Sequence, residues 1–526
     1  MENKTDNITT PAVAAVGNNT EPPKISNPLV TEKRDYDGAV QALFSLQSNG
    51  ATIVDWANKR KMNKIDTTKA LMDEMASFCQ MLDIDMDMKN VIHVAGTKGK
   101  GSTCATIESI IRHQGFTTGL FTSPHLISIR ERIKINGEFV DKDLFSRHVW
   151  YCFDMFERNK LSPPPYFKFL TLVALRIFQD LNIECTILEV GIGGRADATN
   201  IIHHPSVTGI TSLGFDHMNV LGDTLPEIAA EKAGIIKTGC PIFTVNSQRS
   251  DAMEVIKNNA TEVDAPLIIV PRLDQYDQVV EVGLEGDHQK ENAALAIAMS
   301  NCWIMSNQSI SNDKRQSIFN NNLWSQYNPK DNNYSTSYFP SSPLTFKEGL
   351  RSVQWPGRAQ HIVNPLDIPN LDLYLDGAHT PESSIICLNW WRSKVASSTP
   401  DKDILVFTFN STGGRNPTTF LQPYADAINK REMPPFLYGV FPAIILDGGP
   451  TKTSNSHISN NYEDQKQTWE QNLAIIFSGL CKMDADHLIP CSSIDEGAQK
   501  IKDLAAQHPD KRIKVLATGS LYLVVP

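Results

Sequence analysis

A glycine-rich turn after a short apolar run constrains the fold of this chain more than any other feature. Residues 91–94 predict a buried strand, and residues 104–111 predict a helix. Between them lies Gly96-Thr97-Lys98-Gly99-Lys100-Gly101-Ser102-Thr103, whose small residues let backbone N–H groups point inward. The start of the helix adds partial positive charge. This strand–turn–helix unit therefore predicts a phosphate-binding site in an α/β fold.

Two kinds of side chain in the turn suit phosphate and metal binding. Lys100 is placed to reach the outer phosphates of a nucleotide, and Ser102 or Thr103 is placed near a metal ion. The match to the common phosphate-loop pattern is incomplete, because only two residues separate Gly96 from Gly99 where that pattern has four. An ordinary tight turn between a strand and a helix is the alternative, but the surrounding sequence favours nucleotide binding.

Composition narrows the class of protein. A chain of 526 residues with 41% hydrophobic content is long enough for two or more domains with buried cores. Its net charge of −10 argues against nucleic acid as the main partner, although a local basic pocket for a small anion is compatible with that charge. The nine cysteines include no Cys-x-x-Cys pair, and they predict reduced thiols in an intracellular protein.

The N-terminal segment predicts no folded structure. Residues 1–34 are polar and lack hydrophobic periodicity, so we expect a disordered tail. Glu2, Asp6, Glu21 and Glu32 argue against a transit peptide, and the segment has no apolar signal-peptide core. The chain has no run of 18 apolar residues, so we also expect no transmembrane segment. Together these features predict a cytoplasmic protein.

Polar residues follow or end three predicted strands, where open α/β sheets place their ligands. Segments 117–122, 185–190 and 207–213 predict these strands. Ser123 follows the first, Glu189 lies near the end of the second, and His217 comes shortly after the third. A carboxylate on a buried strand is costly unless it forms a salt bridge or binds a metal ion, and both alternatives stay open for Glu189. His217 is either an ordinary loop histidine or a ligand, and its position at a strand end favours the second interpretation.

Further segments predict the rest of a larger first domain. Arg130, Arg132 and Lys134 form either a solvated face or a surface that attracts an anionic substrate. In the helix predicted over 67–82, Ala70, Leu71, Met75 and Phe78 share one face. Other elements are predicted as helices over 40–46, 166–181, 225–236 and 288–305 and a strand over 239–245.

The C-terminal part predicts a second, smaller α/β domain over residues 344–526, after a first domain over 35–343. Residues 306–343 are rich in Asn, Ser and Asp, which predicts a linker or insertion at the boundary. Segments 371–375, 404–409 and 513–520 predict strands, and 448–467 predicts a polar loop.

Taken in order, these segments resemble the folylpolyglutamate synthases of the ATP-dependent Mur ligase superfamily, in their eukaryotic branch. The resemblance covers roughly residues 35–525. Besides the glycine-rich turn, it is carried by Ser123-Pro124-His125-Leu126, Glu189-Val190-Gly191-Ile192-Gly193-Gly194, Ser212-Leu213-Gly214-Phe215-Asp216-His217, Glu231-Lys232-Ala233-Gly234, Trp355-Pro356-Gly357-Arg358 and Asp376-Gly377-Ala378-His379-Thr380.

The resemblance implies a ligase that adds L-glutamate to the γ-carboxyl group of a reduced folate through an acyl phosphate. It implies a two-domain Mur-ligase-like fold, a larger ATPase domain with a mostly parallel sheet and a smaller Rossmann-like C-terminal domain. ATP and Mg²⁺ would be required, and a monovalent cation such as K⁺ is a further candidate. We expect a monomer that binds small-molecule substrates and no nucleic acid, in the cytoplasm, with a mitochondrial pool as the relatives suggest.

The resemblance also assigns roles to residues of this chain. Lys100, Glu189, His217 and Lys232 would be catalytic, and Lys232 is a candidate for carbamylation by CO₂. The residues expected to ligate Mg²⁺ are Ser123, Glu189 and His217. The residues expected to bind ATP are Gly99, Lys100, Gly101, Ser102, Asn292, Arg358, Asp376 and His379.

One departure and two alternatives accompany these expectations. Asn416 follows Arg415 where the family usually has Asp, which leaves the glutamate contacts there open. Dihydrofolate synthase, which adds the first glutamate to dihydropteroate, shares the scaffold. A nucleotide-dependent switch protein without ligase chemistry is the alternative from another class. The presence of Lys100, Glu189, His217 and Lys232 together argues against it.

Overall fold

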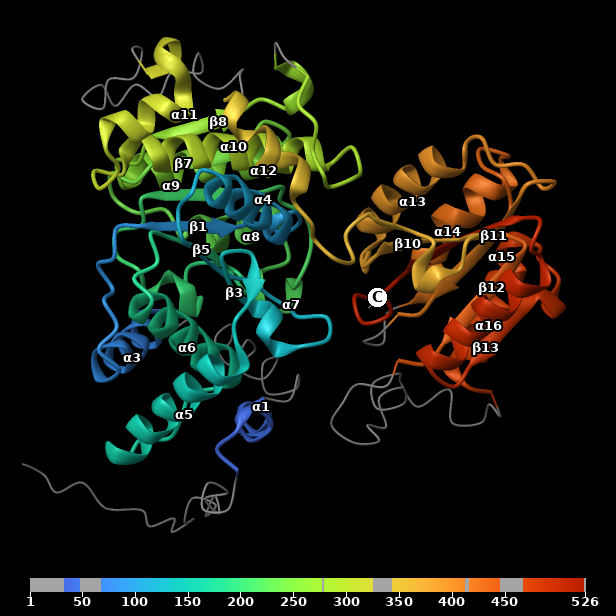
Figure 1. Cartoon of the computed structure of the whole chain (residues 1–526), viewed down its shortest axis with the longest axis horizontal. Coiled ribbons are helices and arrows are strands. Elements are labelled where there is room, and N and C mark those ends of the chain that lie inside the picture. The colour runs from blue at the N-terminus through green and yellow to red at the C-terminus, as the bar shows by residue number, and fades with distance from the viewer. Residues whose placement is uncertain are drawn as a thin grey trace, which may run out of the picture.

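The computed structural model describes residues 33–47, 68–276, 279–324, 343–411, 416–444 and 467–524. They form two α/β bodies, each built around its own sheet, and the smaller body comes from the C-terminal part of the chain (Figure 1). The predicted α/β class with two mostly parallel sheets is confirmed. The predicted tail up to residue 32, Arg415 and nearly all of the polar loop predicted over 448–467 lie outside the described residues.

The first sheet has eight strands in the order β4-β3-β2-β5-β1-β6-β7-β8. From β2 to β8 every pair is parallel, and β3 and β4 add an antiparallel edge. The central strands β1, β5 and β6 are buried along their whole length, as expected where helices cover both faces of a parallel sheet. The bounds are β1 (Val91–Ala95), β2 (Thr118–Phe121), β3 (Ile133–Ile135), β4 (Glu138–Phe139), β5 (Cys185–Glu189), β6 (Val207–Ile210), β7 (Ile242–Val245) and β8 (Leu267–Val270).

Helices cover both faces of this sheet because successive side chains of a strand point to opposite sides. Ile92 and Val94 of β1 pack with α4 and α10 in one core, whereas Val91 packs with α5 and α6 in the other. The bounds are α1 (Tyr36–Ser45), α3 (Thr68–Met81), α4 (Lys100–His113), α5 (Lys142–Arg158), α6 (Tyr166–Asp180), α7 (Met218–Leu221), α8 (Leu225–Ala233), α9 (Ser250–Glu262), α10 (Gln289–Ser306), α11 (Asn312–Trp324) and α12 (Lys347–Ser352). Short 3-10 helices are η2 (Ile129–Arg132), η3 (Ala198–Ile201), η4 (Leu273–Gln275) and η6 (Leu344–Phe346).

The second sheet has six strands in the order β13-β12-β11-β14-β10-β9, and only the pairing of β9 with β10 is antiparallel among the described residues. Its main core is aromatic, with Trp391, Phe407 and Tyr424 fully buried. The strands are β9 (Gln360–Val363), β10 (Leu371–Asp376), β11 (Asp403–Phe409), β12 (Tyr438–Pro442), β13 (Leu488–Cys491) and β14 (Arg512–Thr518). The helices are α13 (Pro381–Val395), α14 (Pro417–Asn429), α15 (Trp469–Cys481) and α16 (Ile494–Gln507), with η7 (Pro365–Asp367) and η8 (Ala485–His487) as 3-10 turns.

The described residues on either side of the expected domain boundary, 306–324 and 344–352, contribute to the core of the first body. Residues 306–343 contain the helix α11, and its Ile318 and Phe319 are buried in the core that α4 and α10 share. Leu350 of α12 joins the same core, and the hydroxyl of Ser109 donates to the carbonyl oxygen of Gly349 at 2.7 Å. Two buried apolar residues thus dock a helix whose composition is mostly polar. The domain division itself stays a prediction.

Two predicted features, the buried face of one helix and the length of another, are smaller in the structure than predicted. Met75 and Phe78 are buried as predicted, but Ala70 is exposed and Leu71 is only partly buried. The helix predicted over 225–236 ends at Ala233, where Gly234 caps it. None of the helices in the described part of the chain has the length and apolarity that crossing a membrane requires.

Candidate active site

A pocket of about 790 Å³ brings the predicted site residues of both bodies together. From the first body it receives the phosphate loop and the ends of β2 and β5, and from the second body it receives the end of β10 and the start of α13. The residues to which the family resemblance assigns ATP or Mg²⁺ binding, and Lys232 as well, all line it: Gly99, Lys100, Gly101, Ser102, Ser123, Glu189, His217, Lys232, Asn292, Arg358, Asp376 and His379.

The phosphate loop is shaped by Gly99 and by the segment that follows β6. Gly99, which precedes α4, has a φ of +89°, and a Cβ atom there would lie 2.2 Å from the Asn292 amide oxygen. Glycine is therefore needed for both the backbone conformation and the close approach. The N–H groups of Thr97 and Lys98 donate to the carbonyl oxygen of Ser212, just beyond β6. The loop leads into the N-terminus of α4, whose first residues Lys100, Gly101 and Ser102 line the pocket.

Of the two hydroxyl residues proposed near a metal ion, Ser102 lines the pocket, whereas Thr103 is fully buried and is not among the lining residues. Ser102 accepts a hydrogen bond of 3.4 Å from the Gln289 side chain at the start of α10. Ser102 therefore lies in the wall of the pocket, and its contact with phosphate stays a prediction.

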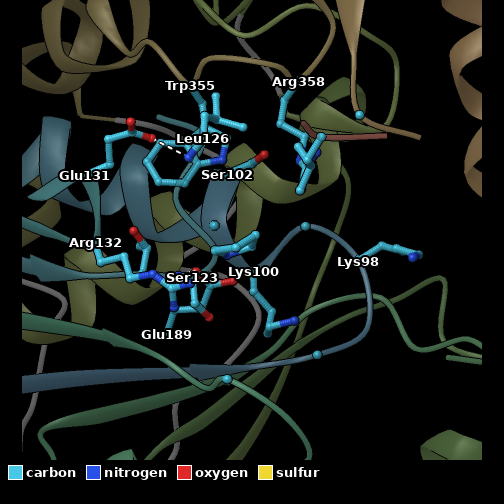
Figure 2. A pocket seen from close by; sticks show the side chains of 18 of the residues that line it. Lys98, Lys100, Ser102, Ser123, Leu126, Glu131, Arg132, Glu189, Trp355 and Arg358 are labelled. Carbon is cyan, nitrogen blue, oxygen red and sulfur yellow. Dashed lines mark hydrogen bonds between the residues drawn. The ribbon is translucent and has the colours of Figure 1, made fainter. Parts of the chain in front are cut away.

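Glu189 and Ser123 meet because β2 and β5 are parallel neighbours in the sheet. The carboxylate of Glu189 accepts a hydrogen bond of 2.9 Å from the backbone N–H of Ser123. Burial raises the pKa of the Glu189 carboxyl, while Lys100 and the Ser123 N–H oppose that shift. Figure 2 shows Ser123, Glu189 and Lys100 grouped together, with Arg132 beside them.

The donor set suits Mg²⁺ only with help from the nucleotide. A carboxylate, a hydroxyl and an imidazole line one pocket, but the described residues contain no group of three His, Cys, Asp or Glu side chains that could hold a metal ion. Mg²⁺ commonly binds one or two carboxylates and takes its other oxygens from phosphates and water. The residues therefore fit a Mg²⁺ ion that arrives with ATP.

The loop that carries His217 is tied to the phosphate loop. Thr97 exchanges two hydrogen bonds of 3.1 Å with Gly214, and the Lys98 Nζ atom lies 2.9 Å from the Asp216 carboxylate. Although burial alone would raise it, Lys98 and His217 lower the pKa of Asp216 well below its usual value. Burial lowers the pKa of the His217 imidazole. His217 thus enters the pocket with a neutral ring favoured and with a φ of +52°.

Lys98 and Lys100 have different positions although both belong to the glycine-rich turn. Figure 2 shows Lys98 extending away from the group formed by Lys100, Ser123 and Glu189. Its amine pairs with Asp216, whereas Lys100 starts α4 beside the pocket. Lys98 is therefore placed to hold the loop of His217, and Lys100 is placed to meet a phosphate.

Lys232 is a buried amine in contact with the phosphate loop. It is 4% exposed, and its Nζ atom donates to the carbonyl oxygen of Gly96 at 2.8 Å. Burial, with the charge of Lys100, lowers the pKa of Lys232 from 10.5 to about 7. The Lys232 side chain thus lies inside the protein, and its neutral amine is favoured as the pH rises above about 7.

The segment before β9 and the second body complete the pocket. The carboxylate of Asp376 accepts a hydrogen bond of 2.8 Å from the Ala359 N–H, which fixes that segment beside the end of β10. Arg358 is close enough to Asp376 to oppose the rise in the pKa of that carboxyl that burial causes. Burial and the charge of Lys98 lower the pKa of His379 to about 4, so its imidazole is neutral at pH 7.

A basic wall of Arg130, Arg132 and Lys134 also lines the pocket. Within the described residues none of these three cations has a carboxylate partner within ion-pair distance. Arg132 instead donates to His125 at 2.7 Å, and Lys134 lies over the ring of Trp355. All three are only partly exposed, so the interpretation as an ordinary solvated face is not supported.

Sequence reasoning did not single out several residues that line the pocket. Asp216 and Trp355 belong to family motifs without an expected role, and His288 begins a predicted helix, yet all three line the pocket together with Asp197. The ring of Trp355 packs on Gly101, where a Cβ atom would lie 2.9 Å away. A signal was present for Asp197: it follows a glycine-rich segment, and its carboxylate accepts hydrogen bonds from the N–H groups of Gly191 and Ile192.

Comparisons with known proteins place the chain in a family. No protein-family model matches it. A Dictyostelium discoideum protein described as a folylpolyglutamate synthase is 45% identical over 548 residues, covering 95% of this chain and 87% of that protein. The Candida albicans folylpolyglutamate synthase is 32% identical over 524 residues, covering 94% and 95% of the two chains. The human mitochondrial enzyme is 37% identical over 398 residues, covering 74% and 65%.

Solved structures share the fold. A Mycobacterium tuberculosis folylpolyglutamate synthase complexed with ADP has a TM-score of 0.63 at 21% identity, covering 93% of this chain and 97% of that one. A complex named for the synthase with AMPPCP and folate has a TM-score of 0.60 at 22% identity, with the same coverage. At these identities the structures support the two-domain architecture, and the curated relatives carry the assignment. The chain belongs to the folylpolyglutamate synthase family.

Proposed function

We propose that the pocket between the two bodies joins L-glutamate to the γ-carboxyl group of a reduced folate, with ATP as the phosphoryl donor. As a member of the folylpolyglutamate synthase family, the chain is an ATP-dependent folate–glutamate ligase. The residue assignments rest on one observation. The phosphate loop, the polar residues at the strand ends and the residues of the second body all line the same pocket. The roles below are proposals for this chain.

The first step brings two anions together. Two unit charges about 4 Å apart repel by about 4 kcal/mol at an effective dielectric constant near 20. Lys100 and the N-terminus of α4 would offset this repulsion at the γ-phosphate. The folate γ-carboxylate oxygen then attacks the γ-phosphorus, the bond to the bridging oxygen breaks, and an acyl phosphate and ADP form.

The second step forms the amide. The neutral α-amino group of L-glutamate attacks the acyl carbon, inorganic phosphate leaves with the bonding electrons, and the nitrogen loses a proton. His379 lines the pocket, and its imidazole is neutral at pH 7, which is the form that accepts a proton. His379 is therefore the candidate to receive the proton of the amine, while His217 is kept for Mg²⁺.

Ser123, Glu189 and His217 would hold Mg²⁺ together with phosphate oxygens. When bound, the ion would supply a positive charge that neutralises the polyphosphate. A requirement for K⁺ stays a prediction. Asn292, which packs on Gly99, would contact the nucleotide from α10.

Lys232 would carry a carbamate. Its neutral amine attacks CO₂, a C–N bond forms, and one proton is released, which changes the charge of the side chain from zero to −1. The pKa of about 7 supplies the neutral amine that this reaction needs. A carbamate would also remove a positive charge that the buried site accommodates poorly.

The basic wall would bind the anionic part of the folate. Arg130, Arg132 and Lys134 supply positive charge, and Phe139 and Phe167 supply apolar surface in the same pocket. An aromatic ring system linked to a glutamyl tail has this combination of apolar and anionic parts. Charge attraction between the wall and the tail would favour substrates that already carry glutamate.

Incubation of the purified chain with ATP, Mg²⁺ and L-glutamate tests the proposal. Tetrahydrofolate and dihydropteroate are offered in separate reactions, and products are identified by mass spectrometry. We expect tetrahydrofolate to gain glutamyl units and ADP to accumulate in proportion. Product from dihydropteroate alone would identify a dihydrofolate synthase. ATP hydrolysis without any ligated product would reject ligase activity and favour the nucleotide-dependent switch.

Location and assembly are also proposals. The human and bovine relatives are named mitochondrial, whereas the composition of the first 34 residues favours the cytoplasm. A cytoplasmic enzyme with a mitochondrial pool would be seen by fractionation of cells that express a tagged chain. A monomer is expected in solution, and light scattering measures it directly.

A further inference from the structure

Glu285 connects the two bodies outside the pocket. It lies in the first body, just before α10, and its Oε2 atom accepts a hydrogen bond of 2.9 Å from the indole N–H of Trp390. The same oxygen lies 2.7 Å from the Lys394 Nζ atom. Trp390 and Lys394 are four residues apart on α13 and therefore share one face of that helix. One carboxylate of the first body thus holds two successive turns of a helix in the second.

The carboxylate is anchored firmly in the first body. Leu284, its neighbour, is buried against Ala105 of α4 and Val353. The Gly283 N–H donates to the Leu350 carbonyl oxygen at 2.8 Å, and a Cβ atom on Gly283 would lie 2.3 Å from the Arg351 carbonyl oxygen. The backbone that presents Glu285 is therefore pressed against the α12 region and has little freedom to shift.

The partner on α13 is equally well held. Trp390 is 4% exposed and belongs to the aromatic core of the second body. Its ring packs edge-on against Tyr374 of β10, with centroids 5.8 Å apart. The contact with Glu285 therefore joins one packed core to another through two short polar bonds.

The helix α13 connects this contact to the pocket. β10 ends at Asp376, and Thr380 caps the N-terminus of α13 right after His379. Ser383 and Ile386, in the first turns of α13, line the pocket. Trp390 lies nine residues after Pro381, roughly 13 Å along the helix at about 1.5 Å per residue. A rotation of α13 about its far end would therefore move His379 relative to the phosphate loop.

We propose that Glu285 is a positioning residue that sets the orientation of the second body, so that Asp376 and His379 face ATP on the phosphate loop. This inference rests on the proposed ATP site between the bodies. The side chains of Lys394 and Glu285 are 28% and 34% exposed, so the ion pair contributes little to the stability of either body. Its effect is on how the two bodies sit relative to each other.

Spin labels on the two bodies measure that effect directly. Labels are placed at two exposed helix positions, Asn258→Cys on α9 and Ala498→Cys on α16, in a Cys481→Ser background because Cys481 is the least buried native thiol. With the native Glu285, we expect pulsed electron paramagnetic resonance to give one narrow distribution of the distance between the two labels. With Glu285→Ala, we expect a broader or shifted distribution and a KM for ATP that rises about three- to tenfold.

A matched control and two partner variants separate this role from a general defect. Glu281→Gln removes a neighbouring ion pair, with Arg351, that lies wholly within the first body, and it should change neither readout. Trp390→Phe and Lys394→Met should each give part of the Glu285→Ala effect. In a double-mutant cycle, Glu285→Gln and Lys394→Met should be non-additive in the KM for ATP, because both remove the same contact.

The outcomes decide between the claims. Unchanged distances and an unchanged KM for ATP in Glu285→Ala overturn the inference. If Glu285→Ala lowers the thermal midpoint, Glu285→Gln, which keeps an oxygen for the indole N–H, serves in its place. The distance measurement needs no catalysis, so a wild-type chain without ligase activity would reject the proposed function while the test of Glu285 still stands.

Discussion

The Nζ atom of Lys232 donates a hydrogen bond of 2.8 Å to the carbonyl oxygen of Gly96, the first glycine of the phosphate loop. An amine on α8 is thereby tied to the loop that would hold the phosphates of ATP. A carbamate nitrogen keeps one N–H group, so this bond is compatible with modification of Lys232. The structure therefore allows the chemistry that the sequence segment around Lys232 suggested.

The first prediction concerns Lys232 itself. Lys232→Ala should lower kcat by about 10²-fold or more, because it removes the charge of the carbamate from a site that is shielded from water. Short carboxylic acids such as acetate should restore part of the activity by occupying the vacated space. Lys237→Ala is the control, since Lys237 donates to the Asn200 carbonyl oxygen and does not line the pocket. Full activity of Lys232→Ala would refute the role.

A second prediction separates the two lysines of the phosphate loop. Lys100→Met should lower kcat by about 10²- to 10³-fold, because the cation beside the γ-phosphate is lost. Lys98→Met should instead leave the Asp216 carboxylate without its partner and disturb the His217 loop. The double variant Lys98→Met with Asp216→Asn should therefore recover part of the activity lost by Lys98→Met. No recovery would mean that Lys98 contacts a substrate directly.

Arg358, just before β9, and Asp376 of the second body should affect ATP binding most. Arg358→Ala and Asp376→Asn should each raise the KM for ATP about tenfold, more than the KM for glutamate, because both line the pocket between the bodies. Steady-state kinetics with each substrate varied in turn measures the two constants. Equal increases for both substrates would contradict an ATP site that spans the bodies.

The basic wall predicts a dependence on substrate charge. Lys134→Met should raise the KM for the folate substrate several-fold, with a larger effect on folates that carry more glutamyl units. Added salt should reduce the difference between the variant and the wild type, because ions screen the attraction. Arg147→Met, an exposed cation on α5, is the control. The same KM ratio for short and long tails would argue that Lys134 does not meet the tail.

The buried His93 predicts a loss of stability on acidification. It is fully buried, its Nε2 atom lies 2.8 Å from the Thr199 hydroxyl, and burial lowers its pKa to about 3. The folded state therefore resists a proton that the unfolded chain accepts below about pH 6.5, so stability is complete above that pH and falls below it. Between pH 7.5 and pH 5.5 this single group should remove about 1.4 kcal/mol.

Urea unfolding of the wild type and His93→Gln at the two pH values measures this contribution. The variant should be less stable than the wild type at pH 7.5, because a packed ring is replaced, but its stability should decrease less as the pH falls. An identical decrease in both proteins would show that other groups control the response, of which His125, with a pKa lowered to about 4, is the next candidate.

Local sequence patterns were enough to predict those site residues that lie on neighbouring strands of the first sheet. The strand–turn–helix unit around Lys100 is a short-range signal, and the structure has both β1 and α4, although α4 begins at Lys100, four residues before the predicted start. Glu189 and His217 were predicted from strand ends, and the carboxyl ends of parallel neighbours meet at one edge of a sheet. The sequence resemblance supplied the family, which the curated relatives confirm.

Relationships between distant segments were decided by the tertiary structure. The sequence contains Lys98 and Lys100 two residues apart, but only the packed loops show that one pairs with Asp216 and the other starts α4 at the pocket. The helix α11 escaped prediction because its composition is mostly polar, although Ile318 and Phe319 are buried in the core of the first body. The burial of Lys232, and hence its lowered pKa, depends on how α8 meets the phosphate loop. Hydrophobic periodicity reports which face of an element is buried, but it carries no information about which other element covers that face, and side-chain charge states follow from that choice.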